Sequence, residues 1–291
     1  MKRFLSYLLW PALMASAIAV NAYGMSTGMP LLWLNISYFG LAATLFVLER
    51  VMPHEPRWNE NDGQLWPDIG HTLLSKSAVQ VLIIVPALTG IGALASDEGA
   101  AWWPGSWPVA LQIVLGLVIA EFGFYWAHRL CHEIRALWRF HAVHHSVTRL
   151  WFVNTGRFHF IDTLISVLFG LGVALAAGMP QDIIVWVSAI TAYIGLLTHT
   201  NVEMRFGPLD YVFNTPALHR WHHSRRPEEG NSNYGENLML FDLLFGTHFV
   251  TRRRPPVDIG IDEPMPATLR AQIAHPFRRG GGEPRTLEAN A

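Results

Sequence analysis

The chain of 291 residues has very little cysteine and few charges. Its single cysteine, Cys131, excludes an internal disulfide and any zinc site built from several thiolates. Charged residues make up only 15% of the chain, and the net charge of −1 gives no electrostatic reason to expect a nucleic-acid partner. The HExxH motif of many zinc hydrolases is also missing, which removes the usual source of a general base beside a zinc ion.

Long apolar runs take the place of charge, because 51% of the residues are hydrophobic. We therefore predict an all-α, polytopic membrane helix bundle. Four runs are long enough to span a membrane, and two more, separated by a GMPQ turn, form a further hydrophobic hairpin that need not cross completely. The first run could instead be a signal peptide, but its length of about 20 residues favours a membrane helix. In chain order the runs are 4–23, 31–49, 72–95, 108–127, 161–177 and 182–198.

The positions of lysine and arginine predict the orientation of this bundle. With a cytoplasmic N-terminus, the loops on the far side are 24–30, 96–107 and 178–181, and none of them contains a Lys or Arg. Basic residues are enriched in cytoplasmic loops of membrane proteins. Trp102, Trp103 and Trp107 in one of the far loops predict an aromatic belt at the interface.

Histidine is concentrated in three short motifs between residues 128 and 223. Residues three and four apart share one face of a helix, so each motif places two or three imidazoles together. Thr215 and Pro216 predict the start of a helix that carries the third motif. The motifs are HRLCH, with His128 and His132; HAVHH, with His141, His144 and His145; and HRWHH, with His219, His222 and His223.

So many imidazoles in one region must stay mostly neutral or repel one another, and a bound metal is the usual reason to tolerate such crowding. His199 ends the last apolar run and points back toward the same layer, so we expect it to be a further metal ligand. Glu121 lies seven residues before His128 and thus about two turns earlier on the same helix face. It is either a polar residue facing the bundle or a carboxylate that orients a ligand histidine.

The three motifs, in this order on a hydrophobic chain, resemble those of the fatty acid hydroxylase/sterol desaturase superfamily of integral-membrane di-iron oxygenases. Supporting details are EFGFYWAHRLCH, TPALHRWHH, and NYG followed by FDLLFGT. The resemblance covers residues 105–250, give or take a few positions. We accordingly divide the chain into N-terminal membrane helices (1–107), a catalytic region (108–250) and a flexible C-terminal tail (251–291). Glu121 departs from the family, in which similar sequences often have Asp.

The resemblance implies two iron ions, O2, a membrane lipid substrate such as a fatty acyl chain or sterol, and a separate ferredoxin or cytochrome b5-like electron donor. The eight motif histidines with His199 would give each metal four or five nitrogen ligands. Zinc can replace iron in purified protein, because divalent zinc binds nitrogen sites more tightly. Arg225, Arg226 and residues 252–254 could dock an acidic donor, or equally contact anionic lipid headgroups.

Several functions are compatible with such a centre. We favour hydroxylation of a lipid C–H bond over desaturation of the same lipid, because hydroxylation requires only one hydrogen abstraction. A zinc-dependent membrane hydrolase and a metal-ion transporter are rivals from other classes. A transporter would place its histidines near the bilayer midplane on broken helices, whereas these motifs lie mainly at helix ends.

Overall fold

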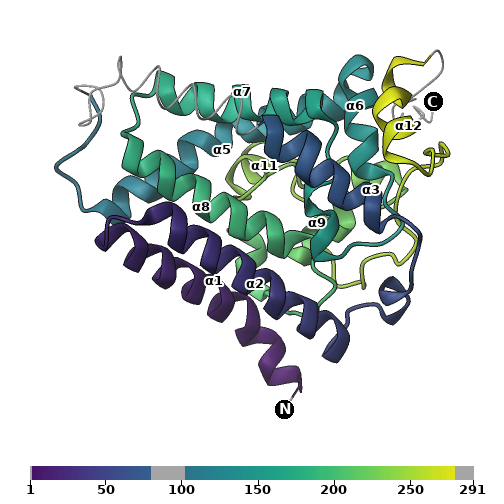
Figure 1. The fold of residues 1–291 in the computed structure, drawn as a ribbon, viewed down its shortest axis with the longest axis horizontal. Helices are drawn as coiled ribbons and strands as arrows, with labels where there is room; N and C mark the ends of the chain where they lie inside the picture. Colours follow the sequence, from purple (N-terminus) through teal and green to yellow (C-terminus); the bar gives the residue numbers. More distant parts are fainter. Residues whose placement is uncertain (1, 80–101, 279–291) are drawn as a thin grey trace.

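The computed structural model describes residues 2–79 and 102–278, and it is almost entirely helical, with isolated β-bridges but no β-strand in these ranges. Figure 1 shows the long helices running side by side along the molecule, with the short helices α3, α9 and α12 gathered at one end. The long helices are α1 (Lys2–Ser26), α2 (Pro30–Val51), α5 (Val109–Glu133), α6 (Arg135–His145), α7 (Phe160–Ala176) and α8 (Gln181–Thr198).

Shorter elements connect the long helices and build the cap at this end. They are η1 (Pro56–Asn59), α3 (Leu65–Gly70), the π-helix η2 (His71–Ser77), η4 (Phe152–Gly156), η5 (Gly207–Tyr211), α9 (Pro216–His222), α10 (Pro227–Gly230), α11 (Leu240–Phe245), α12 (Leu269–Ala274) and η6 (His275–Phe277). The helix expected after Thr215 is confirmed: the Thr215 hydroxyl accepts the backbone N–H of Leu218, and Pro216 occupies the first turn of α9.

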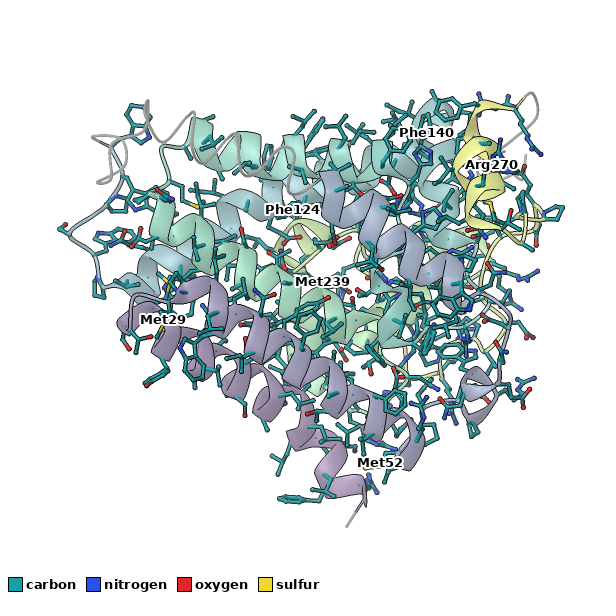
Figure 2. All side chains as sticks on the ribbon, in the orientation of Figure 1. Met29, Met52, Phe124, Phe140, Met239 and Arg270 are labelled. Carbon is teal, nitrogen blue, oxygen red and sulfur yellow. The ribbon has the colours of Figure 1, made fainter. Side chains whose placement is uncertain are left out.

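Four described helices, α1, α2, α5 and α8, are long and apolar enough to cross a membrane, and α7 is a shorter apolar helix. This confirms the all-α membrane bundle. Most of the expected span 72–95 lies outside the described residues. Met29 and Met52 mark the two ends of α2 in Figure 2. Trp103 differs from the expected interfacial belt, because it is buried and its indole N–H donates to Gln112 Oε1 at 2.7 Å, whereas Trp102 and Trp107 are exposed.

Helices α7 and α8, which form the predicted hairpin, both pack on α5. The last turns of α5 reach the cap (Figure 1). Close approach of α5 and α7 depends on glycine. A Cβ atom on Gly123 would overlap the carbonyl oxygen of Phe169 and approach the Cα of Gly170 to 3.0 Å. The backbones of α5 and α7 can therefore touch, as small residues allow in membrane bundles.

Residues 251–278, which the sequence assigns to a flexible tail, pack against the body of the protein. Gln272 on α12 is fully buried, accepts a hydrogen bond from His71 at 3.1 Å and donates to Gln64 at 2.9 Å. The composition of this segment is polar, and so it gave no indication that specific side-chain hydrogen bonds hold it in place.

The glycine contact between α5 and α7 yields a prediction about stability. Gly123→Ala should lower the melting temperature of the detergent-solubilised protein, because overpacking costs about 1–3 kcal/mol. Gly172→Ala on α7 is the matched control, since no atom of the described residues lies within 4 Å of its added Cβ. Thermal unfolding followed by circular dichroism measures both variants. Equal melting temperatures for the two would contradict the packing argument.

Candidate metal centre

All nine histidines named from the sequence meet at the cap end of the bundle, in two adjacent clusters. Within each cluster the potential ligand atoms lie within 4.8 Å of one another. The first cluster has five members and the second has four, so each is large enough to hold a metal ion. The first contains His128, His132, His141, His145 and His222; the second contains His144, His199, His219 and His223.

The second and third motifs each contribute to both clusters. Successive residues on a helix point about 100° apart, so neighbours such as His144 and His145 diverge. His144 joins the second cluster and His145 the first, and His222 and His223 divide in the same way. The two clusters therefore share helices α6 and α9 and cannot form independently of each other.

The Nε2 atoms inside the clusters lie at distances that suit a shared metal. His145 Nε2 is 3.1 Å from the Nε2 atoms of both His132 and His141, and His219 Nε2 is 3.1 Å from His223 Nε2. Two nitrogens bound to one metal at about 2.1 Å are about 3.0 Å apart when they subtend a right angle. A single proton on His145 Nε2 could satisfy only one of its two contacts, whereas a cation satisfies both.

Burial keeps five of these imidazoles uncharged. None of the nine side chains is more than 8% exposed. Loss of solvation, reinforced by neighbouring imidazoles, holds the pKa values of His144, His145, His219, His222 and His223 well below the usual range. Neutral imidazole is the form that binds a metal, so the protein presents the ligands in the state that binding requires.

Backbone carbonyls fix the rings of three ligands. His128 Nδ1 donates to the carbonyl of Tyr234 at 2.8 Å, His222 Nδ1 to Ser232 at 2.7 Å, and His144 Nδ1 to Arg157 at 3.3 Å. These bonds place the proton on Nδ1 and leave the lone pair of Nε2 directed into the cluster. The segment that contains Ser232 and Tyr234 therefore forms one wall of the site.

Side chains fix three further rings. His141 Nδ1 donates to Asp162 Oδ2 at 2.9 Å, His199 Nδ1 to Asn154 Oδ1 at 2.9 Å, and His132 Nδ1 to Asn231 Oδ1 at 3.3 Å. Sequence reasoning missed all three partners. The sequence does contain a signal for Asp162, because a single acid at the start of the apolar run 161–177 needs a buried partner.

Glu121 binds the loop that orients a ligand histidine, not the histidine itself. Its carboxylate accepts the backbone N–H groups of Glu236 at 2.6 Å and Asn237 at 2.9 Å. Asp242 accepts the preceding two, from Tyr234 at 2.8 Å and Gly235 at 2.7 Å. Four successive N–H groups are thus held by two carboxylates, and Glu121 acts on His128 through the loop that supplies the Tyr234 carbonyl.

A second buried carboxylate anchors the other side of the site. Glu49, near the end of α2, accepts the backbone N–H groups of Phe152 and Asn201, both at 2.9 Å, and the hydroxyl of Thr200 at 3.2 Å. These residues adjoin the segments that carry Asn154 and His199. Asn201, two residues after His199, accepts the backbone N–H of Glu55 and donates to its carbonyl.

A small cavity of about 20 Å³ lies between the helices beside both clusters. Five of the cluster histidines line it together with apolar side chains such as Phe124 and Phe158. Phe124, which is half-buried, is labelled near the centre of Figure 2. The cavity therefore borders both clusters at once.

Known proteins are similar to this chain over much of its length. Residues 113–247 match the family model described as fatty acid hydroxylase. Ornithine lipid hydroxylase OlsE of Rhizobium tropici is 48% identical over 281 residues, which cover 95% of this chain and 85% of that protein. Alkylglycerol monooxygenase of Xenopus tropicalis is 31% identical over 181 residues, 62% of this chain and 37% of that protein.

A fungal protein adds a third relative. Fatty acid hydroxylase vlmA of a Lecanicillium species is 28% identical over 211 residues, which cover 65% of this chain and 54% of that protein. No solved structure matches the chain. The similarity to the Rhizobium protein extends over nearly the whole chain. The chain belongs to the fatty acid hydroxylase family.

Proposed function

We propose that the protein hydroxylates a C–H bond of a membrane lipid at a pair of iron ions, one in each histidine cluster. As a member of the family it is an oxidoreductase of the lipid hydroxylase and monooxygenase class. The single observation that carries the metal assignment is the pair of buried clusters, one of five and one of four imidazoles, with Nε2 atoms 3.1 Å apart. Bound iron would supply the oxidising power that no side chain has.

The reaction consumes O2, two electrons and two protons; one oxygen atom enters the C–H bond and the other leaves as water. The electrons are proposed to come from a separate ferredoxin or cytochrome b5-like donor. The contribution of the chain is to hold the ligands. Asp162 and the carbonyl of Tyr234 fix the tautomers of His141 and His128, and burial keeps bulk water away from the clusters.

The length of α5 supports a site at the membrane surface. Its 25 residues extend about 37 Å, whereas the hydrocarbon core is about 30 Å thick. His128 and His132 lie in its last two turns and would therefore stand at the level of the lipid headgroups. Together with the distribution of Lys and Arg, this supports our proposal that the three motifs are on the cytoplasmic side.

The relative from Rhizobium supports a choice of substrate. Its name states that it hydroxylates ornithine lipid, and it is aligned with 95% of this chain. We propose ornithine lipid, or another lipid with an amino-acid headgroup, as the substrate. Desaturation is disfavoured because the relatives are named as hydroxylases and monooxygenases, and family membership argues against a hydrolase or a metal transporter.

Lipid mass spectrometry tests this function directly. Membranes from cells that make ornithine lipid, with iron and oxygen supplied, should contain a species heavier by one oxygen atom only when the protein is expressed. A species lighter by two hydrogens would show desaturation instead. No new species in cells that contain ornithine lipid and a functional ferredoxin would count against the proposed substrate.

Removing one ligand tests the metal centre. His222→Ala should abolish turnover and reduce the iron content to below two per chain, while the protein still inserts into the membrane. His248→Ala is the control, because His248 lies outside both clusters and bonds only the carbonyl of Asp210 among the contacts described. Iron is counted by elemental mass spectrometry. Full activity in His222→Ala or His144→Ala would contradict the di-metal assignment.

The Asp162 contact gives a separate prediction. Asp162→Asn keeps the size of the side chain but removes the negative charge that strengthens His141 as a ligand. Loss of such a partner lowers metal affinity by about 10- to 100-fold. Titration with an iron chelator measures the change, and Asp182→Asn, at the first turn of α8, is the matched control. Unchanged chelator resistance in Asp162→Asn would exclude this role.

A further inference from the structure

Asn214 Oδ1 is one of the buried polar atoms beside the clusters that have no hydrogen-bond partner among the described residues. Asn214 is only 2% exposed and lines the cavity that both clusters border. Its Oδ1 atom makes no hydrogen bond to any described residue. A buried acceptor without a partner is unusual, because the lost solvation is not recovered. Such an atom in a functional cavity indicates that a ligand supplies the missing donor.

The orientation of this side chain is fixed. Asn214 Nδ2 donates to the carbonyl of Gly235 at 2.7 Å, and the backbone N–H of Asn214 donates to the carbonyl of Asn237 at 2.9 Å. The bond from Nδ2 assigns the two ends of the amide, because only the nitrogen can donate to a carbonyl. Oδ1 is therefore an acceptor held in place before any ligand arrives.

The loop that holds Asn214 is the one clamped by Glu121 and Asp242. Its four successive N–H groups are bound by the two carboxylates, so the Gly235 carbonyl cannot move freely. A preorganised acceptor binds a donor with little loss of conformational entropy. The same loop directs His128 through Tyr234, and so it ties the position of the acceptor to that of the first cluster.

The chemistry of the cavity favours a donor over an anion. Glu236 lines the same cavity, whereas none of the described lining residues is Lys or Arg. Phosphate groups are usually bound by such cations. Because the Asn214 oxygen is a neutral acceptor, its preference for a donor does not depend on the charge that metal ions add nearby.

From this geometry we infer that Asn214 Oδ1 is a substrate-binding atom that accepts a hydrogen bond from an N–H group in the headgroup of the lipid. The inference rests on the proposed substrate class, since an amino-acid headgroup carries two kinds of N–H donor. One is the amide that links the acyl chain, and the other is the side-chain ammonium. Asn214 thereby recognises the polar end of a lipid while the apolar side chains of the cavity contact its hydrocarbon.

The experiment compares three probes on the wild-type protein in nanodiscs: ornithine lipid, its N-methyl amide, and its N-trimethylammonium derivative. Binding is measured by native mass spectrometry and turnover by product mass. One of the two methylated probes should bind on the order of tenfold more weakly than ornithine lipid, and the one that does identifies the donor. Equal affinity for all three probes overturns the inference even if no variant can be purified.

Asn214→Leu provides the second arm. This variant should bind ornithine lipid about as weakly as the methylated probe, and it should no longer distinguish the two. If Asn214 served only to support the loop, the variant would weaken every probe by the same factor and keep the wild-type ratio. Asn35→Leu is the control, because Asn35 is exposed on α2 and bonds only the carbonyl of Leu31.

The two proposals fail in different ways. Wild-type protein that binds ornithine lipid with the predicted discrimination but makes no hydroxylated product would contradict the substrate and leave the role of Asn214 supported. Protein that hydroxylates ornithine lipid but binds it and both derivatives with equal affinity would support the proposed function. It would exclude Asn214 Oδ1 as a substrate-binding acceptor.

Discussion

Nine imidazoles packed into two buried clusters are the constraint on which the rest of the structure depends. Each ring must keep its proton away from the cluster and direct Nε2 inward. For six of the rings the surrounding protein provides an acceptor to Nδ1, from three carbonyls and three side chains. The cap of short helices and loops is arranged to bring these acceptors together, and the spanning helices supply the platform.

Two carboxylates on spanning helices connect that platform to the cap. Glu121 on α5 and Glu49 on α2 each accept two backbone N–H groups from cap segments. Burying a carboxylate is costly unless several donors satisfy it, and here each carboxylate has at least two. The hydrogen bonds that offset the cost of burial therefore fix the position of the loops that hold His128 and His199.

The sequence predicted the helical membrane architecture and every histidine of the two clusters, because hydrophobic length and helical spacing are local properties of the chain. It did not predict Asp162, Asn154 or Asn231 as partners of the rings, since those contacts join residues 21 to 99 positions apart. Glu121 was recognised as unusual, but its actual partners lie 115 and 116 residues later. Periodicity carries no information about pairs so distant.

The burial of Gln272 shows the same limit in the C-terminal segment. Pro, Arg and Gly dominate the residues after 251, a composition typical of flexible chain. Only the three-dimensional contact of α12 with His71 and Gln64 reveals that the segment covers one side of the cap. A buried amide that bonds both His71 and Gln64 cannot be recognised from the composition of the segment.

The division of adjacent histidines between the clusters has a consequence for assembly. Helices α6 and α9 each reach into both clusters, with His144 beside His145 and His222 beside His223. An ion captured by either cluster immobilises the same two helices and so prepares the remaining ligands for the next ion. If both clusters bind metal as proposed, loading is expected to be cooperative, and a chain carrying a single ion would be a minor species at every stage of maturation.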